Sequence, residues 1–436
     1  MGSMSDVFDR PSRAPHEPRR VIFTPRFVTM LISGLTTFAL LGVMMVLPVP
    51  YAVQGAGPTF DTVAGHDDGG NADAAGEPEG PGGSEEPVES EESEASEEAD
   101  GSGEPEGSDG SDESDEADES AEPTLITVSG SESYPAAGQL RLTTVVTAGG
   151  PGYPVRAGNV ILGFWNSAEM VQPVEAAFDP TLTREERDEL SAQQMITSQE
   201  HATVSALTDL GYDVPAVMHI VDAAPGTGAE GVVAEGDLIL GIQGPGETEE
   251  QVDTYADLAD VLADTDAGAE VNLIVERDEE TVHLPITTTD DGMGNTQLGI
   301  FLQADFEMPI DVDIAIDNVG GPSAGLMFAL GIIEVLTPGD LTGGRNIAGT
   351  GTISLDGRVG PIGGVTMKMI GAVQDGSEYF LAPRANCAEV VGNIPSGLQV
   401  IAVENLEQAR GAVESIAAGD TDDLPECTDA DEVQPG

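Results

Sequence analysis

The stretch Asn318-Val-Gly-Gly-Pro-Ser-Ala-Gly325, followed by the apolar run LMFALGIIEVL up to Leu336, decides how the C-terminal part of the chain folds. Before it, Asp311–Ile316 alternates polar and apolar residues as a half-buried strand does. The glycines permit a tight turn, so we expect Ser323 at or near a helix N-terminus, where backbone N–H groups and the helix dipole favour a developing oxyanion. Taken alone, Ser323 is more simply explained as a helix N-cap.

A second segment favours catalysis. It begins at Asn346 as NIAGTGTISLDGRVGPIGGVTMK and ends at Lys368, where the apolar, helix-like MKMIGAVQ begins. Of the 15 lysine and arginine residues in the chain, Lys368 is the only lysine. Arginine, with a pKa above about 12, stays charged, whereas a desolvated lysine can lose its proton near neutral pH and accept one from a serine hydroxyl. The pattern therefore predicts that Lys368 is a base.

Together the two segments resemble the proteolytic domain of Lon-family serine peptidases over roughly residues 300–418. G-P-S-A-G is followed by the lysine 45 positions after the serine, with G-T-I-x-x-x-G-x-V-x-P-I-G-G before it. The resemblance implies that Ser323 is the nucleophile, Lys368 the general base, and Thr350 a threonine whose hydroxyl orients the lysine amine. It also implies a homo-oligomeric ring. Gly320 stands where Lon proteins often have an acidic residue, so we expect substrate entry or the resting site to differ.

Residues 214–298 have the pattern of short strands and one helix. In order they contain AVMHIV, GDLILGIQG, a helix around Tyr255–Ala263, and the alternating AEVNLIVERDEETVHLPI. This order resembles a bacterial, circularly permuted PDZ domain, which presents a sheet edge to which an extended peptide can add as another strand. We therefore predict a PDZ-like domain that binds protein or peptide substrates; a small sandwich with a purely structural role is the alternative.

The segment 124–213, upstream of the PDZ-like pattern, is predicted to hold two strands and a helix. The elements expected there are strands over Thr124–Val128 and Gln139–Thr147, and a helix over Pro180–Leu207 that begins at Thr181 or Thr183. We expect this helix to link or pack on neighbouring units, and nothing in its sequence indicates catalysis.

Acidic residues dominate the composition. The formal net charge of -64 arises from 79 acidic and 15 basic side chains. Residues 65–122 are almost entirely Glu, Asp, Ser, Gly, Ala and Pro, which predicts an acidic, disordered tether without a specific ligand. Residues 419–436 are predicted to be an acidic tail. Because this field repels phosphates, we expect no nucleic acid partner.

An uncharged, apolar run from Phe27 to Pro48 follows an arginine-containing N-terminal segment, residues 1–26. As a helix it would be roughly 33 Å long, enough to cross a lipid bilayer. The arginines before it and the acids after it predict a single-pass protein with a cytoplasmic N-terminus and an extracytoplasmic catalytic domain. A cleavable signal peptide is the alternative, although the run is longer than such peptides require and no clear cleavage site follows.

No cofactor or metal site is expected. Cys387 and Cys427 are the only cysteines, with no C-x-x-C pair or histidine cluster beside them. If the domain is exported, we expect these two cysteines to form a disulfide, with two buried thiols as the alternative. The sequence contains no G-x-x-x-x-G-K-[ST], so no P-loop ATPase is expected.

The predicted architecture is a multidomain α+β protein: an N-terminal transmembrane helix, a PDZ-like β-rich domain and a C-terminal Lon-type proteolytic domain. This combination resembles the membrane-anchored, ATP-independent Lon-like peptidases of the YlbL type. It predicts a serine endopeptidase that cleaves unfolded, exported or membrane-proximal segments. The alternative from another class is a catalytically silent, PDZ-containing membrane scaffold that binds peptide partners.

Overall fold

The structure is a computed structural model. It describes residues 25–65, 124–150, 153–166, 168–292, 294–316 and 318–428. The predicted acidic tether (residues 65–122) lies outside the described residues except for Gly65, as do residues 1–24 of the predicted cytoplasmic tail and residues 429–436 of the acidic tail. The chain divides into two compact units, which are Met1–Gly55 with Thr147–Leu182, and Ala56–Val146 with Thr183–Gly436.

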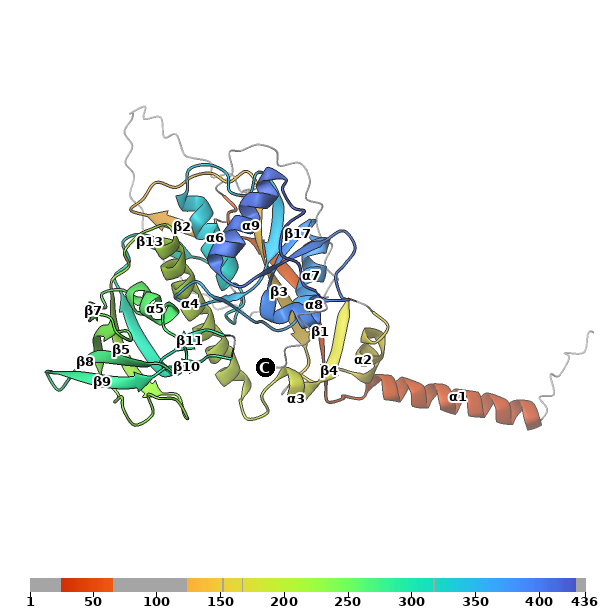
Figure 1. Cartoon of the computed structure of the whole chain (residues 1–436). Coiled ribbons are helices and arrows are strands. Elements are labelled where there is room, and N and C mark those ends of the chain that lie inside the picture. The colour runs from red at the N-terminus through yellow and green to blue at the C-terminus, as the bar shows by residue number, and fades with distance from the viewer. Residues whose placement is uncertain are drawn as a thin grey trace, which may run out of the picture. The chain divides into compact units, whose positions relative to one another are not determined.

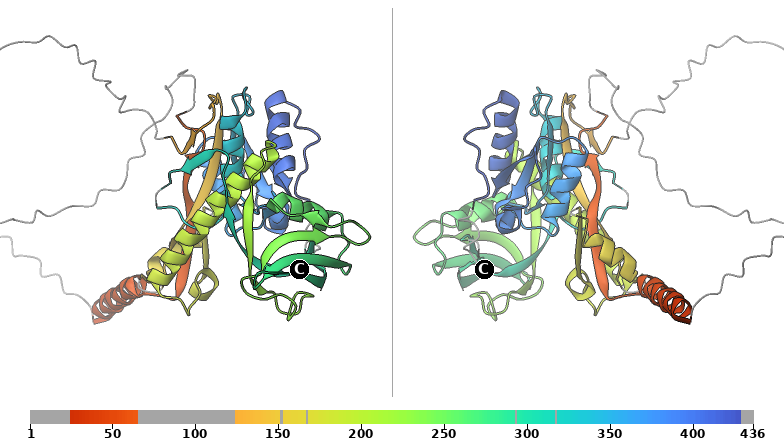
Figure 2. Two further views of the ribbon diagram at one scale, coloured as in Figure 1. Left: turned by 90° about the vertical axis from the view of Figure 1, so that its left-hand side faces the viewer. Right: turned by 90° about the vertical axis from the view of Figure 1, so that its right-hand side faces the viewer.

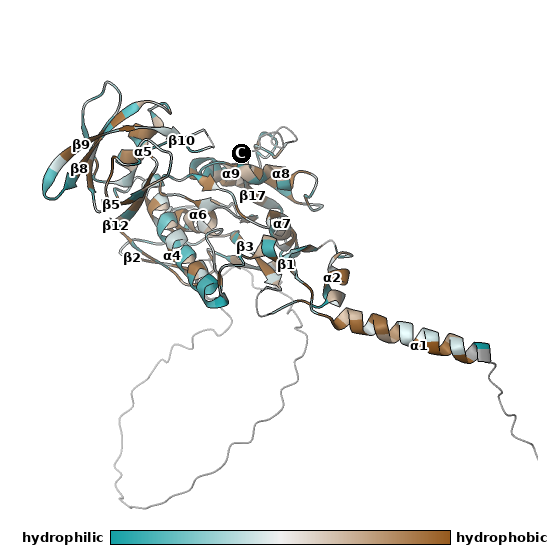
Figure 3. Cartoon of the chain, turned by 90° about the horizontal axis from the view of Figure 1, so that it is seen from below, coloured by the Kyte–Doolittle hydropathy of each residue, from teal (hydrophilic) through white to brown (hydrophobic). Residues whose placement is uncertain are grey.

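The first unit contains one long apolar helix, α1 (Pro25–Val46), which lies almost entirely within the predicted span of residues 27–48 (Figures 1 and 3). Its 22 residues correspond to roughly 33 Å at the α-helical rise. The segment Val28–Val46 is long and apolar enough to cross a membrane. By length and composition, α1 is therefore a candidate membrane span or signal anchor.

The rest of the first unit is small. The first half of strand β1 (Tyr51–Asp61) pairs antiparallel with β4 (Glu169–Pro173), from Tyr51 opposite Pro173 to Gly55 opposite Glu169. The helices α2 (Ala157–Gly163) and α3 (Val174–Ala177) flank β4 in the sequence. Both helices contact β4.

In the second unit, β1 continues into a larger sheet with the strand order β18-β17-β14-β3-β1. Its other strands are β3 (Gln139–Ala148), β14 (Asn346–Gly349), β17 (Tyr379–Pro383) and β18 (Gln399–Val403). Strand β14 pairs in parallel with both β3 and β17, and β17 pairs in parallel with β18. Such parallel strands are buried on both faces, as the burial of Phe380 and Ile401 shows.

Helices pack around this sheet, and the central one is α6 (Gly325–Leu336), all of whose residues are buried. The long helix α4 (Arg184–Asp209) packs on α6 (Figures 1 and 2). Thr183, one of the two predicted N-caps, begins α4 with a capping box that includes Glu186. Helix α9 (Leu406–Ala418) packs in the same core as α4 and α6. Helices α7 (Val365–Gln374) and α8 (Cys387–Val390) pack against the other face of the sheet, and a short 3-10 turn, Arg384–Asn386, precedes α8.

Two short strand pairs complete the proteolytic part. Strand β2 (Ile126–Ser129) pairs with β13 (Asp311–Ile314), and β15 (Thr352–Ile353) pairs with β16 (Val359–Gly360).

A second sheet, with the order β12-β5-β6-β8-β9, forms a separate hydrophobic core with helix α5 (Tyr255–Ala263). Its strands are β5 (Ala216–Ala223), β6 (Leu238–Gln243), β8 (Glu270–Arg277), β9 (Glu280–Thr287) and β12 (Ile300–Phe306), with β7 (Glu250–Gln251) beside β6. The hairpin β10 (Thr289–Asp290) and β11 (Thr296–Gln297) precedes β12. The strands β5, β6, β8 and β9 and the helix α5 are those that the PDZ-like pattern predicts, whereas β7, β10, β11 and β12 were not predicted. We call residues 216–306 the PDZ-like unit.

The sheets place the domain boundaries differently from the sequence prediction. Strand β12, assigned from sequence to the catalytic domain at residues 300–418, pairs with β5 and belongs to the PDZ-like unit. Strand β3, assigned to a separate segment at residues 124–213, pairs with β14 of the proteolytic sheet. Both differences arise because a strand's partner is set by long-range pairing, which local pattern does not reveal. The PDZ-like unit is thus inserted between α4 and β13 of the proteolytic fold.

The two ends of the predicted acidic tether meet. A Cβ built on Gly65 would lie 2.2 Å from Thr124 Oγ1, so these residues are in direct contact. Before Gly65, the chain already belongs to the proteolytic sheet, since Thr62 donates a backbone hydrogen bond of 2.9 Å to Leu140 O. The acidic segment therefore does not connect the apolar helix to the sheet, which corrects its description as a tether: it is an insertion that leaves and returns at one place.

The predicted disulfide between Cys387 and Cys427 is confirmed. It joins the start of α8 to the segment after α9. Next to it, Ala402 N donates a 2.7 Å hydrogen bond to Pro425 O, so the C-terminal segment lies along β18. The bond thereby fixes the described end of the chain to the proteolytic sheet.

Candidate active site

Ser323 lies in the turn that enters α6. The helix begins at Gly325, and its N-cap is Ala324, without a capping side chain. The simpler interpretation of Ser323 as a helix N-cap is therefore wrong, and its hydroxyl is directed elsewhere. A left-handed Gly321, with a φ of 84°, permits the tight turn that the glycines predicted.

The turn before Ser323 rests on helix α4. Gly321 N donates a 3.0 Å hydrogen bond to Ser191 O, and Ser198 Oγ donates one of 3.1 Å to Pro322 O. A Cβ on Gly320 would come within 2.2 Å of Ser191 Oγ, so a side chain at this position would require the hydroxyl of Ser191 to rotate away. The serine turn therefore packs closely on α4.

Lys368 comes from the first turn of α7, which begins after a left-handed Gly364 with a φ of 71°. Its Nζ lies 2.7 Å from Ser323 Oγ and 2.8 Å from Thr350 Oγ1. The side chain is only 2% exposed. Burial, which disfavours the charged ammonium, lowers the pKa of Lys368 from its ordinary value to about 7.

Thr350 follows β14 and is fully buried. Its hydroxyl accepts the hydrogen bond from Lys368 and donates one of 2.9 Å to Ser323 O. Gly351 N donates a second hydrogen bond of 2.9 Å to the same carbonyl oxygen. A hydroxyl has one proton to donate, so these contacts fix both its direction and the position of the Ser323 backbone.

The structure thus brings together the three residues selected from the sequence, Ser323, Thr350 and Lys368, from three separate elements. They adjoin a cavity of about 570 Å³ whose lining includes Ser323 and Lys368. Much of the lining is apolar and comes from distant parts of the chain, including Phe60, Leu142, Met195, Val319 and Ile362.

Two contributions to the site were not predicted. The segment Pro361–Gly363 lines the cavity, and it is held by the buried Asn386, whose side chain accepts from Ile362 N at 2.9 Å and donates to Ile362 O at 2.8 Å. The second contribution is the support from α4 through Ser191 and Ser198. The sequence does not predict either set of contacts, because isolated Asn and Ser residues are too common to indicate a tertiary contact.

The histidines described by the structure lie in other surroundings. His201 Nδ1 is 3.2 Å from Ile353 O, while His219 and His283 are in β5 and β9 of the PDZ-like sheet. Within the described ranges, no group of three or more His, Cys, Asp or Glu side chains is arranged to hold a metal ion.

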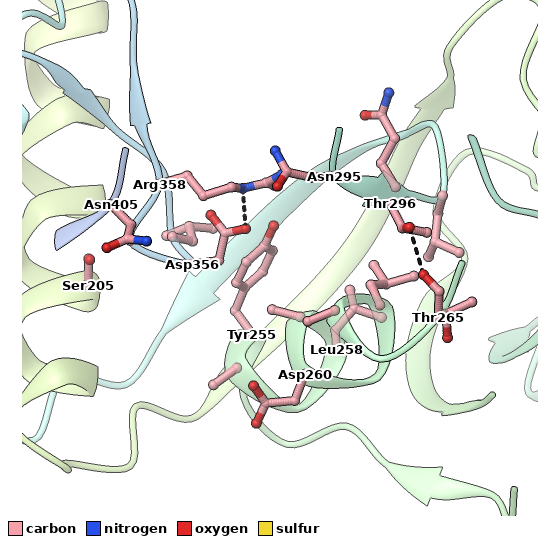
Figure 4. A pocket seen from close by; sticks show the side chains of 18 of the residues that line it. Ser205, Tyr255, Leu258, Asp260, Thr265, Asn295, Thr296, Asp356, Arg358 and Asn405 are labelled. Atoms are coloured by element: carbon pink, nitrogen blue, oxygen red, sulfur yellow. Dashed lines mark hydrogen bonds and ion pairs between the residues drawn. The ribbon is translucent and has the colours of Figure 1, made fainter. Parts of the chain in front are cut away.

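A second cavity, of about 730 Å³, lies between helix α5 and strand β12 of the PDZ-like unit and the turn Leu355–Arg358 of the proteolytic fold (Figure 4). Tyr255 faces this turn, and burial, followed by the nearby charge of Asp356, raises the pKa of its phenol to about 12. Arg358 forms ion pairs with Asp356 at 2.6 Å and with Asp291 of the PDZ-like unit at 3.1 Å. The PDZ-like unit and the proteolytic fold, which both belong to the second unit, therefore each contribute to the lining of this cavity.

Comparison with known proteins gives an independent view of the same region. Residues 306–413 match the model of the Lon protease (S16) C-terminal proteolytic domain. Lon protease 2 of Herpetosiphon aurantiacus is 39% identical over 106 residues, covering 23% of this chain and 13% of the relative. Lon protease 2 of Bacillus subtilis is 38% identical over 107 residues, covering 23% and 18%. The chain thus spans less than a fifth of the length of these curated relatives.

Among solved structures, the PDZ domain of the SdrC-like protein from Listeria monocytogenes is similar to part of this chain. The sequence identity is 21% and the TM-score 0.18, with 20% of this chain and 85% of that chain covered. On the matched residues, we identify the C-terminal region of this chain, residues 306–413, as a Lon-type proteolytic domain.

Proposed function

We propose that this protein is an ATP-independent serine endopeptidase in which Ser323 is the nucleophile, Lys368 the general base and Thr350 the residue that orients the lysine. One observation carries the proposal: a buried lysine amine lies 2.7 Å from the hydroxyl of Ser323. Its pKa, lowered by burial to about 7, suits proton transfer at neutral pH.

In the proposed reaction, Ser323 Oγ attacks the carbonyl carbon of the scissile peptide bond while neutral Lys368 Nζ accepts the hydroxyl proton. The resulting ammonium gives this proton to the leaving amine as the C–N bond breaks, which leaves an acyl-enzyme ester. Lys368, again neutral, then accepts a proton from water as the water oxygen attacks the ester carbonyl carbon. The ammonium returns this proton to Ser323 Oγ as the acyl C–O bond breaks, which restores free Ser323 and neutral Lys368, and the released carboxylic acid loses its own proton to solvent. Proton and bond changes balance over the cycle, and no cofactor is needed.

Negative charge develops on the substrate carbonyl oxygen during both attacks. The N-terminus of α6 begins two residues after Ser323, and its partial positive charge and backbone N–H groups favour such an oxyanion. The bonds from Thr350 Oγ1 and Gly351 N to Ser323 O hold this turn in place. Pre-organised donors of this kind lower the barrier without reorganisation during the reaction.

The proposal of ATP independence rests on the single lysine. A P-loop needs its own lysine beside the nucleotide phosphates, and Lys368 is buried next to Ser323. We therefore propose that the substrates are unfolded or flexible polypeptide segments, since this sequence supplies no motor to unfold folded ones.

Substrate capture is assigned to the PDZ-like unit. Strand β12 stands at the end of the strand order in its sheet, and α5 lines the cavity beside it. An extended peptide that pairs with this edge would satisfy the backbone groups of β12 and place side chains against apolar residues such as Leu258 and Leu302.

We also propose that α1 anchors the protein in a membrane, with the N-terminus in the cytoplasm and the proteolytic domain outside. The arginines before α1 support this orientation, and the disulfide between Cys387 and Cys427 fits an oxidising compartment. A homo-oligomeric ring, which the resemblance to Lon implies, is part of the proposal and is tested by the mass of the detergent-solubilised full chain.

The decisive experiment measures cleavage of a fluorogenic, unstructured polypeptide by the full chain in detergent, with and without ATP. We expect turnover that ATP leaves unchanged and that Ser323→Ala abolishes. Ser415→Ala is a matched control, since the hydroxyl of Ser415 donates to Gly411 O within α9, away from Ser323. Undetectable turnover in the parent together with retained peptide binding would instead support the silent scaffold.

A further inference from the structure

An exposed apolar cluster lies at the C-terminal end of helix α2 and directly after it, in the first unit. Its members are Ile161, Leu162, Phe164 and Trp165, with exposed fractions of 44%, 69%, 68% and 86%. Trp165 is the only tryptophan in the chain. Large apolar side chains that are adjacent and open to water usually mark a surface that another partner covers. We call these four residues the α2 patch.

Contacts inside the first unit join α2 to the C-terminal end of α1. Ala157 N donates a 2.9 Å hydrogen bond to Leu47 O, and Val49 N donates one of 3.0 Å to Val155 O. A Cβ on Gly158 would lie 3.0 Å from Met45 O, so α2 starts against the last turn of the apolar helix. Figures 1 and 3 show α2 beside this end of α1.

These contacts place the patch at the level where α1 ends. A helix of seven residues is roughly 10 Å long, so residues that follow it stay close to the last turn of α1. Because α1 is about as long as the hydrocarbon core is thick, its last turn lies near the boundary between hydrocarbon and headgroups. Aromatic side chains are enriched at this depth, because a ring such as the Trp165 indole is apolar and also has a hydrogen-bond donor.

Charge near the patch is sparse and of both signs. The chain has a formal net charge of -64, yet Ser133–Ala168 contains no Asp or Glu, and Arg156, the N-cap residue of α2, is exposed to solvent. An arginine at this position can bind the phosphates of lipid headgroups. The acidic group beside α2 is Glu169, whose carboxylate accepts a 3.1 Å hydrogen bond from Asn166 Nδ2 and adjoins Gly163.

We propose that the α2 patch inserts into the headgroup region of the lipid leaflet from which the C-terminal end of α1 emerges. This inference rests on the proposed membrane anchor. Together with α1, the patch gives the first unit a second attachment point, which restricts rotation of β1 about the axis of the anchor. Because α2 contacts the C-terminal end of α1, the patch lies beside the proposed membrane anchor, which favours lipid over a second copy of the chain as the occupant.

The single tryptophan makes the test direct. The full chain is reconstituted in vesicles of phosphatidylcholine and phosphatidylglycerol, and the fluorescence of Trp165 is measured with lipids brominated at different depths. We expect a blue-shifted emission and loss of about half of its intensity with lipids brominated near the headgroup, because an interfacial indole meets those bromines. Emission at the wavelength of exposed indole, quenched by aqueous acrylamide but not by brominated lipids, overturns the proposal.

A matched variant separates failure of the patch from failure of the anchor. In Trp165→Phe/Phe38→Trp, the only indole lies in the middle of α1 and should be quenched by deeply brominated lipids. If that indole is quenched while Trp165 of the parent stays aqueous, the anchor stands and the patch proposal falls. If neither is quenched, both fall. Trp165 shielded from acrylamide, insensitive to brominated lipids and exposed again on dilution in detergent would show a contact between copies, which also overturns it.

A second variant tests the patch with the indole in place. Leu162→Asp/Phe164→Asp changes two exposed side chains and should leave the thermal transition unchanged. We expect Trp165 emission in vesicles to shift to the red and its quenching by brominated lipids to fall, because acids oppose insertion. Unchanged quenching in this variant would contradict the proposal.

Discussion

Lys368 Nζ lies 2.7 Å from Ser323 Oγ, although the two residues are 45 positions apart and enter the site from the turn before α6 and from the first turn of α7. The amine is buried, its nearest acceptors are two hydroxyls, and the chain contains no other lysine. Burial is the cause that lowers the pKa of Lys368, and it favours the neutral amine, which is the form that can accept a proton. The geometry and the protonation equilibrium therefore support the same chemical role.

The first prediction concerns pH. Since the neutral amine is the proposed active form and burial lowers the pKa of Lys368 to about 7, turnover should rise with pH and level off above neutrality. At pH 6 it should be about tenfold below the plateau, because one pKa unit corresponds to a factor of ten in the protonation ratio. Labelling with ¹⁵Nζ-lysine gives one side-chain signal, and its titration should have the same midpoint. A midpoint near the ordinary lysine value would contradict the proposed base.

The second prediction separates proton transfer from charge. Lys368→Arg keeps a positive charge but cannot accept a proton at working pH, so turnover should fall by about 10³-fold or more. Ser323→Ala, measured in parallel, sets the background. The matched control is Arg345→Lys, since the side chain of Arg345 forms an exposed ion pair with Glu378, and this exchange should leave turnover unchanged. Near-parental activity of Lys368→Arg would show that charge, not basicity, is what the site uses.

The third prediction concerns stability. The pKa of Lys368 is lower in the folded state than in the unfolded chain, so the unfolded chain binds more protons between about pH 7 and 10.5. The buried lysine therefore lowers the free energy of unfolding. This destabilisation is largest below pH 7, where it amounts to about 5 kcal/mol, and it declines as pH rises. Lys368→Met removes it, so the variant should gain stability relative to the parent at pH 6 and lose that advantage by pH 10. Denaturant unfolding at several pH values measures the difference in unfolding free energy between the variant and the parent. A difference that does not change with pH would contradict a pKa of Lys368 lowered by burial.

The fourth prediction addresses Thr350 as a positioning residue. Thr350→Val keeps the shape of the side chain but removes both the acceptor for Lys368 and the donor to Ser323 O. A lost buried hydrogen bond costs about 1–3 kcal/mol, so kcat should fall roughly 10- to 100-fold while KM changes little. Thr350→Ser restores the hydroxyl and should recover most of the rate. Equal losses in Val and Ser variants would indicate packing rather than orientation of the amine.

The candidate site was more predictable from sequence than the fold around it. Ser323 and Lys368 lie in compact motifs in which glycine turns precede apolar helices, so local pattern indicates where each side chain emerges. The pairing of β3 with β14 has no such signal, because Gln139–Leu142 meets Asn346–Gly349 across about two hundred positions of sequence. Parallel pairing of this kind depends on the whole sheet, and β-branched runs alone do not select a partner.

The role of helix α4 shows the same limit. Its amphipathic pattern and N-cap at Thr183 were predictable, and the expectation that it packs on a neighbour is confirmed by its contact with α6. Its support for the serine turn was not predictable. That support depends on the carbonyl of Ser191 and the hydroxyl of Ser198, which are functional only because the fold brings Gly321 and Pro322 to them.

The last prediction concerns the acidic insertion between Gly65 and Thr124. These two residues are in contact, and β1 already links α1 to the sheet before the insertion begins. Replacing residues 66–123 with a short Gly-Ser linker should therefore leave turnover unchanged. If the segment is the flexible chain that its composition predicts, closing a shorter loop should stabilise the fold by about 2 kcal/mol. Thermal unfolding and cleavage by the full chain measure both effects. As a control, a variant of the same length has Asn and Gln in place of the acidic residues, which separates the effect of loop length from that of charge. If turnover falls in the deletion but not in this control, the length of the insertion matters to catalysis.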